Sequence, residues 1–272
     1  MPNSPEQVRI NHHQIDLWIT VPGDITDADL LQRYDHLLTK EERQRQQRYL
    51  LDTHRHDALI TRAFARTVVA KYTDTPPQDL KFSQGPKGKP ELNHPKTAVQ
   101  FNISHTHNCI VCAVILVQDI GIDIEHTGRK IDIANLAKRN FSATENQQLF
   151  ALPQIMQRQR FFDYWTVKES YIKAWGLGLA IPLTDFSFKI NDTEQDYKNL
   201  FTIKKDISLS FAQHRVDEPH IWRSWIVYPT AEIDEKQEHR IALSLRAKID
   251  NQKTDYQLRF FDTLPLLGYQ EL

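Results

Sequence analysis

Two acidic residues lie two positions apart in the segment Gly121-Ile-Asp-Ile-Glu125. Residues two apart on a β-strand point to the same face, so Asp123 and Glu125 should project together while the isoleucines face a core. Two carboxylates on one face repel each other unless a positive group joins them. Mg²⁺ would join them, because it binds one or two carboxylates and keeps positions for water and a substrate phosphate. A solvated outer strand face is the alternative.

A second group of reactive side chains lies in the aromatic-rich segment 161–178. Trp165, Glu169 and Lys173 are spaced i, i+4 and i+8, which places them on one face of a helix, with Lys168 beside them. Aromatic residues cover nearly every angle of this helix, so it should be largely buried. A buried glutamate and two lysines need partners, which a metal with bound phosphates would supply. On an exposed helix, Glu169 and Lys173 would only form a surface pair.

Histidine and lysine side chains precede the paired carboxylates along the chain. Ser104 and His105 lie at the corner between two expected strands, and the loop before them carries Lys87 and Lys89 among glycine and proline residues. A single histidine is commonly structural. Its place between a basic loop and two carboxylates makes His105 a candidate for binding an anion.

An arginine-rich segment is predicted to form one long helix from a capping box at Thr39 and Glu42 to about Tyr72. Residues 40–71 hold 8 Lys or Arg against 4 Asp or Glu, so the net charge of −1 for the whole chain hides a basic patch. Such a patch suits phosphate, nucleic acid or plain solvent. The arginines that share about 100° of arc on an unbroken helix are Arg45, Arg48, Arg55, Arg62 and Arg66.

Cations for phosphates and three carboxylates for a metal together indicate phosphoryl or phosphodiester chemistry. The sequence contains no glycine-rich phosphate loop, no Gly-x-Ser-x-Gly elbow and no His-Glu-x-x-His motif, so side chains must hold the phosphates. A Mg²⁺-dependent phosphodiesterase or nuclease is one alternative. Its wide basic surface disagrees with the net charge of −1, so no nucleic-acid partner is expected.

The elements that must position these residues follow from periodicity and turn signals. The chain of 272 residues is long enough for two subdomains, and helices grouped between strands indicate an α+β fold. Cys109 and Cys112 lie in an apolar run and are expected to be core thiols of a buried strand. Strands are expected at 15–20, 99–103, 109–117, 120–124, 186–190, 201–203, 221–227, 240–245 and 256–261, and further helices at 131–140, 142–152 and 161–175.

Three blocks in this order resemble the Sfp-type 4′-phosphopantetheinyl transferases: residues 101–105, 121–125 and 165–176. The resemblance covers about residues 38–190. It implies two similar α/β-mixed subdomains with a cleft between them that holds coenzyme A. The expected halves are residues 1–118, with the basic helix and the coenzyme A loop, and residues 119–272, with the metal carboxylates.

The resemblance also implies a reaction, which is transfer of 4′-phosphopantetheine from coenzyme A to a serine of an apo acyl or peptidyl carrier protein, of the holo-[acyl-carrier-protein] synthase type. Adenosine 3′,5′-bisphosphate leaves. By motif, Asp123, Glu125 and Glu169 would hold Mg²⁺, Glu169 or a water near it would be the base, and Lys173 would neutralise the pyrophosphate. The residues expected to contact coenzyme A are Arg48, Arg55, Lys87, Lys89, Ser104, His105, Lys168 and Lys173.

The remaining expectations concern partners and location. No apolar run is long enough to cross a membrane and the N-terminus resembles no signal peptide, so a cytoplasmic protein without a membrane partner is expected. Two fused halves favour a monomer. A coenzyme A or carrier-protein binding module without catalysis is the second alternative, although Asp123 and Glu169, which such a module would not need, are both present.

Overall fold

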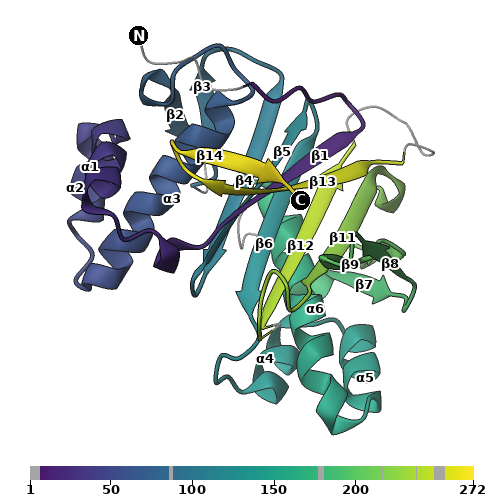
Figure 1. Cartoon of the computed structure of the whole chain (residues 1–272). Helices are drawn as coiled ribbons and strands as arrows, with labels where there is room; N and C mark the ends of the chain where they lie inside the picture. The colour runs from purple at the N-terminus through teal and green to yellow at the C-terminus, as the bar shows by residue number, and fades with distance from the viewer. Residues whose placement is uncertain (1–6, 86–87, 177–180, 216, 237, 248–254) are drawn as a thin grey trace. The chain divides into compact units, whose positions relative to one another are not determined.

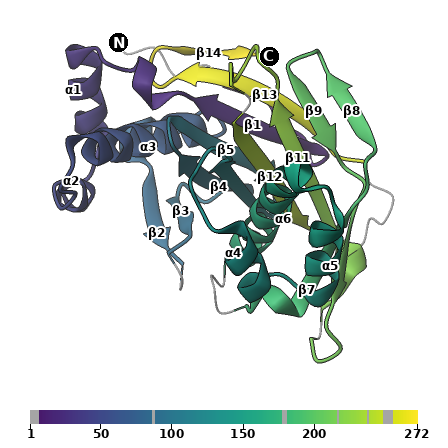
Figure 2. The same ribbon diagram turned by 90° about the horizontal axis from the view of Figure 1, so that it is seen from below.

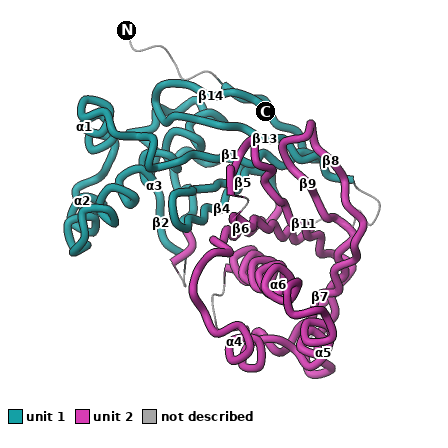
Figure 3. Tube along the Cα trace, turned by 60° about the horizontal axis from the view of Figure 1, so that its bottom comes forward, with its two compact units in different colours: residues 1–85, 90–117, 255–272 teal, residues 86–89, 118–254 magenta. Residues whose placement is uncertain are grey.

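Figure 1 shows the computed structural model of the chain, which describes residues 7–85, 88–176, 181–215, 217–236, 238–247 and 255–272. It contains two compact units (Figure 3). Each unit combines a five-stranded sheet with helices, which confirms the expected mixed α/β class. None of the helices in these ranges is long and apolar enough to cross a membrane. Unit 1 holds residues 1–85, 90–117 and 255–272, and unit 2 holds residues 86–89 and 118–254.

The sheet of unit 1 has the strand order β14-β13-β1-β5-β4. Its strands are β1 (Gln14–Thr20), β4 (Val99–Thr106), β5 (Cys109–Leu116), β13 (Gln257–Leu264) and β14 (Gly268–Glu271). The apolar strand β5 is central, and both cysteines on it are buried and unpaired, as predicted.

Residues 255–272 at the end of the chain belong to unit 1. The sequence predicted them to lie in the second half, residues 119–272. Strand β13 runs parallel to β1 and pairs with it. The guanidinium of Arg259 on β13 donates to both carboxylate oxygens of the buried Asp16 on β1, at 2.7 Å each. A buried carboxylate requires such a partner, so this pair fixes β13 in the sheet of unit 1.

The predicted long arginine-rich helix is wrong as a single element. The helices of unit 1 are α1 (Ala28–Leu37), α2 (Lys40–Gln46) and α3 (Asp52–Ala70), and a small hairpin pairs β2 (Lys81–Gln84) with β3 (Pro90–His94). The capping box of Thr39 and Glu42 opens α2 as predicted. The helix ends at Gln46, and Leu50, between α2 and α3, is 92% exposed. Asp52 starts α3, because an acidic residue favours a helix N-terminus.

The sheet of unit 2 has the order β6-β12-β11-β9-β8, and every neighbouring pair is antiparallel. A separate ribbon pairs β7 (Phe186–Ile190) with β10 (Ile207–Phe211). The strands of the sheet are β6 (Asp119–His126), β8 (Glu194–Tyr197), β9 (Phe201–Lys204), β11 (Trp222–Pro229) and β12 (His239–Arg246).

A long aromatic helix covers one face of this sheet. It is α6 (Gln154–Trp175), which packs on β6 and β12, with α4 (Ile133–Asn140) and α5 (Ala143–Ala151) flanking it (Figure 2). The helix starts seven residues before the predicted 161 and ends at Gly176, whose φ of 69° is a left-handed helix cap. Its aromatic residues are largely buried, as their spacing predicts.

Strand β6 and helix α6 come unusually close at Gly121. A Cβ atom built on this glycine would lie 2.0 Å from the carbonyl oxygen of Ser170 and 2.3 Å from the nitrogen of Ala174. Only a residue without a side chain fits there. The glycine therefore sets the distance between the strand and the helix that carry the predicted site.

Replacing Gly121 by alanine should destabilise unit 2. The added Cβ atom would collide with backbone atoms, which cannot rotate away as a side chain can. Overpacking of this kind costs about 3 kcal/mol in the free energy of unfolding. Thermal or denaturant unfolding of the variant measures the loss.

Gly268→Ala is the matched control, because a Cβ atom at Gly268 meets no atom within 4 Å. Its stability should stay within about 0.5 kcal/mol of the unmodified chain. Equal stability of the two variants would show that β6 and α6 do not approach each other closely at Gly121.

Candidate active site

Three carboxylates of unit 2 lie at the contact between β6 and α6, where the charge of Asp123 acts on both glutamates. Asp123 and Glu125 are on β6, and Glu169 is on α6. Residues on alternate positions of the strand share a face, so Asp123 and Glu125 lie on the side where Gly121 touches the helix. We call Asp123, Glu125 and Glu169 the carboxylate centre. The alternative of a solvated outer strand face is wrong, because this face packs on α6.

Helix α6 contacts the strand carboxylates at two points. The indole N–H of Trp165 donates to Oε1 of Glu125 at 3.0 Å, and Nζ of Lys173 lies 2.6 Å from Oδ1 of Asp123. Trp165, Glu169 and Lys173 do share one helix face, and Glu169 lies between the two contacts. The i, i+4, i+8 spacing thus brings the helix and strand motifs together in space.

Burial and the charge of Asp123 raise the pKa values of the two glutamates of the carboxylate centre. Burial first, and then the charge of Asp123, raise the pKa of Glu125 to about 7, although Arg129, Trp165 and Lys173 oppose the rise. Burial and Asp123 also raise the pKa of Glu169, against the effect of Lys173. A carboxylate whose pKa is raised toward neutrality can accept a proton as a general base.

The donor chemistry of the carboxylate centre fits a hard divalent cation. Carboxylate oxygens are the ligands that Mg²⁺ takes in proteins, and the repulsion between Asp123 and the two glutamates is what a doubly positive ion relieves. In the described ranges, no three His, Cys, Asp or Glu side chains are already arranged around one metal position. Instead, Lys173 pairs with Asp123, and Nη1 of Arg129 lies 3.2 Å from Oε2 of Glu125.

The structure contradicts the predicted contact of Lys168 with coenzyme A. Lys168 is 0% exposed, and its Nζ lies 2.8 Å from Oε2 of the buried Glu145. The same ammonium donates to the carbonyl oxygens of Leu183 and Phe186 at 2.8 and 2.6 Å. Successive helix residues differ by about 100° in direction, so Lys168 faces the core while Glu169 faces β6.

Lys87 and Lys89, the two loop lysines predicted to contact coenzyme A, differ in what the structure shows of them. Nζ of Lys89 donates to the carbonyl oxygens of Ile120, at 2.9 Å, and Ala174, at 3.4 Å. Lys89 is thus part of unit 2, where it satisfies a carbonyl in the last turn of α6. Its contact with coenzyme A stays a prediction. Lys87 lies outside the described residues.

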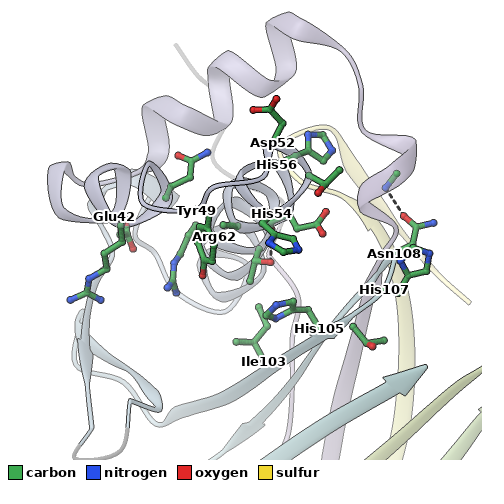
Figure 4. A pocket seen from close by; sticks show the side chains of 18 of the residues that line it. Glu42, Tyr49, Asp52, His54, His56, Arg62, Ile103, His105, His107 and Asn108 are labelled. Carbon is green, nitrogen blue, oxygen red and sulfur yellow. Dashed lines mark hydrogen bonds between the residues drawn. The ribbon is translucent and has the colours of Figure 1, made fainter. Parts of the chain in front are cut away.

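A cavity of about 1400 Å³ lies within unit 1, between the α2 and α3 segment and the end of the β4–β5 hairpin. His105 lines it and faces the same hollow as His54 of α3 (Figure 4), while its contact with an anion stays a prediction. Ser104 is buried and does not line the cavity, because neighbouring strand residues point to opposite faces.

The arginines of this cavity differ from those that the sequence suggested. Arg45 and Arg62 line the cavity, whereas Arg48 and Arg55 do not. Arg55 instead pairs with Asp52 and donates to the carbonyl oxygen of Tyr49. Arg66, which was placed on the same stripe, is buried and pairs with Glu42 at 2.8 Å. The break between α2 and α3 separates Arg45 and Arg48 from the other three arginines, which stay together on α3 and differ in their own contacts.

Sequence reasoning overlooked several cavity residues. Histidines line the cavity in two pairs, and the sequence shows each pair as His-x-His: His54 with His56, and His105 with His107. That repeated spacing on two segments was the available signal. Arg45 and Arg62 give the cavity two donors for an anionic ligand, and Glu42, Asp52 and Asp57 line it as well.

Comparisons with known proteins match both units. Residues 119–243 match the family model of the 4′-phosphopantetheinyl transferase superfamily, and residues 26–116 match that of the 4′-phosphopantetheinyl transferase N-terminal domain. The 4′-phosphopantetheinyl transferase HetI of Nostoc sp. is 32% identical over 70% of this chain and 80% of its own length.

Two further proteins are similar over a smaller part of this chain. The 4′-phosphopantetheinyl transferase Sfp of Bacillus subtilis is 34% identical over 60% of this chain and 71% of its own length. The solved structure of holo-[acyl-carrier-protein] synthase from Thermotoga maritima aligns with a TM-score of 0.34 and 16% identity, over 48% of this chain and 64% of that chain.

The raised pKa of Glu125 makes the stability of the chain depend on pH. Between the ordinary value of 4.5 and the folded value of about 7, the folded chain keeps a proton that the unfolded chain releases. The stability from this proton is complete at low pH and is lost as the pH rises through this window. The loss is roughly 3 kcal/mol at most. Unfolding curves of the unmodified chain and of Glu125→Gln, at about pH 5 and about pH 8, measure it.

The difference in the free energy of unfolding between about pH 5 and about pH 8 should be smaller for Glu125→Gln than for the unmodified chain, because glutamine does not titrate. Glu232→Gln is the control, since Glu232 is exposed and should leave the pH dependence unchanged. If Glu125→Gln kept the full pH dependence of the unmodified chain, the raised pKa would be assigned to the wrong residue.

Proposed function

The chain belongs to the 4′-phosphopantetheinyl transferase superfamily, and we propose that it transfers 4′-phosphopantetheine from coenzyme A to a serine of an apo acyl or peptidyl carrier protein. The reaction would be of the holo-[acyl-carrier-protein] synthase type. The observation that carries the proposal is the carboxylate centre with Trp165 and Lys173, which lies inside the matched residues 119–243. Family membership also removes the reason to prefer a nuclease.

The chemistry assigned to the centre is a displacement at phosphorus. The serine Oγ forms a bond to the phosphorus that carries the pantetheine, and the bond from this phosphorus to the bridging pyrophosphate oxygen breaks. Adenosine 3′,5′-bisphosphate leaves with the bonding electrons. Such reactions depend on the positioning of the nucleophile and on neutralisation of the phosphate charge.

Each residue of the centre has a part in this reaction. Glu169 takes the proton of the serine hydroxyl, which its raised pKa supports. Lys173 places positive charge beside the leaving group. Asp123, Glu125 and Glu169 would hold Mg²⁺, which when bound supplies positive charge against the pyrophosphate.

The cavity of unit 1 is assigned to the 3′-phosphate of coenzyme A. Arg45 and Arg62 line it together with His105, and arginine binds phosphate with a forked pair of donors. These two arginines replace Arg48 and Arg55 in the assignment. The cavity of about 1400 Å³ exceeds the size of a single phosphate group and leaves room for more of the nucleotide.

The unmodified chain, with coenzyme A and Mg²⁺, should increase the mass of an apo carrier protein by one phosphopantetheine group. Glu169→Gln should abolish the mass increase, because glutamine cannot accept the serine proton, while coenzyme A binding persists. Intact-protein mass spectrometry of the carrier and calorimetry with coenzyme A measure the two properties. Glu232→Gln, at an exposed glutamate, is the control that should keep full activity.

The assay is run with a panel of acyl, peptidyl and aminoadipate carrier proteins, so that the result does not depend on the choice of a single carrier. If no carrier gained mass with the unmodified chain, the transferase proposal would be wrong. If Glu169→Gln transferred as fast as the unmodified chain, only the role of Glu169 as base would be wrong.

The cavity arginines should determine affinity for the 3′-phosphate. Arg62→Ala and Arg45→Ala should each weaken coenzyme A binding about tenfold, the usual effect of losing one hydrogen bond to a charged group. Arg48→Ala, a neighbouring exposed arginine outside the cavity lining, is the matched control. Titration calorimetry measures all three dissociation constants.

3′-Dephospho-coenzyme A shows which phosphate these arginines contact. The unmodified chain and the Arg62→Ala and Arg45→Ala variants should bind this compound equally, because it lacks the group that they would hold. A weakening of the same size for both ligands would assign the cavity to another part of the nucleotide.

A further inference from the structure

The two carboxylate oxygens of Glu125 have partners of different kinds. Oε1 accepts a hydrogen bond from the neutral indole of Trp165, while Oε2 lies 3.2 Å from the guanidinium of Arg129. Trp165 is part of the buried helix α6 and keeps Oε1 in place. Arg129 lies in the segment between β6 and α4, four residues after Glu125.

The backbone of this segment is fixed, whereas the side chain of Arg129 is held by its contact with Glu125 and by a cation–π contact with Phe162, 5.9 Å from the ring centroid. Arg158 on α6 donates to the carbonyl oxygen of Thr127 at 2.7 Å and to the carbonyl oxygen of Arg129 itself. The side chain of Arg129 is 43% exposed, against 12% for that of Glu125. The guanidinium can therefore turn into water without movement of the main chain. The turn would break the pair with Glu125 and the contact with Phe162, and the half-exposed guanidinium would be hydrated instead.

Lys173 is less suited to leave the carboxylate centre. Its side chain is 29% exposed, and its Nζ is only 2.6 Å from Oδ1 of Asp123. It also shares the helix face of Glu169 and has a role in the proposed reaction. Of the two cations paired with the strand carboxylates, Arg129 is the more exposed and has the longer contact.

A guanidinium 3.2 Å from Oε2 of Glu125 would repel a divalent cation bound by this carboxylate and would compete with it for the lone pairs of that oxygen. We propose that Arg129 is a displaceable counter-cation of the carboxylate centre, which neutralises Glu125 until a divalent cation takes Oε2 and thereby lowers the affinity for that cation. This inference rests on the proposed function, which assigns a metal to Asp123, Glu125 and Glu169. It adds a residue outside the three motif blocks to the determinants of metal affinity.

Direct titration of the full chain with Mn²⁺, without coenzyme A or carrier protein, tests this role. Mn²⁺ accepts the same oxygen ligands as Mg²⁺ and is followed by electron paramagnetic resonance. Arg129→Met keeps most of the side-chain stem and removes the charge. It should bind Mn²⁺ about two- to fivefold more tightly, the range expected when a weak competing ion pair is removed. Arg129→Lys, which keeps the charge, should bind close to the unmodified chain.

Lys130→Met is the matched control, because it removes the same charge from the next, exposed residue. Its affinity shows how much of the change comes from net charge alone, and it should change less than that of Arg129→Met. Thermal unfolding of each variant confirms that it is folded.

Unchanged or weaker Mn²⁺ binding by folded Arg129→Met would overturn the role of Arg129, and so would an equal gain in Lys130→Met. If carriers are still modified in those cases, the proposed function is unaffected. If the unmodified chain bound no Mn²⁺, both the role of Arg129 and the metal assignment would fail.

Discussion

The close contact between β6 and α6 at Gly121 is the constraint on which the carboxylate centre depends. The absence of a side chain lets the strand reach the backbone of the helix at Ser170 and Ala174. At that spacing, Trp165 reaches Glu125 and Lys173 reaches Asp123. A larger residue at position 121 would separate the two elements and lengthen both contacts. The strand and helix motifs therefore act as one site only because the glycine precedes them.

The same contact has an electrostatic cost. It places Glu125 and Glu169 in partly buried positions near Asp123, where burial and the charge of Asp123 disfavour the charged forms of the two glutamates. Lys173 and Arg129 relieve part of this repulsion. The remaining imbalance suits the proposed chemistry, because it attracts a divalent cation and makes Glu169 a better proton acceptor. Functional sites commonly contain such unfavourable arrangements, which the rest of the fold maintains.

Two neighbouring residues of α6 show how a shared motif divides into different roles. Lys168 forms a buried pair with Glu145 and binds the carbonyls before and at the start of β7, so it fixes the helix against α5 and the β7 ribbon. Glu169 faces the strand and takes part in the proposed reaction. Of the two, only Glu169 has a part in the proposed reaction.

Local patterns determined much of this protein without any structure. The alternation in 121–125, the spacing from Trp165 to Lys173 and the capping box at Thr39 depend on residues a few positions apart, and each is present in the fold. The resemblance of the three blocks also indicated the family, which the family models confirm. The residues by themselves left a transferase and a nuclease open, because both reactions need carboxylates and cations near phosphate.

Only the tertiary structure decided which partners those patterns meet. Lys173 and Asp123 are 50 positions apart, and Arg259 and Asp16 are 243 apart, so no local rule could pair them. Arg45 and Arg62, and not Arg48 and Arg55, line the cavity, and packing on α5 and β7 buries Lys168. Secondary structure follows from neighbours along the chain, whereas burial and ion pairing follow from neighbours in space, which exist only after folding.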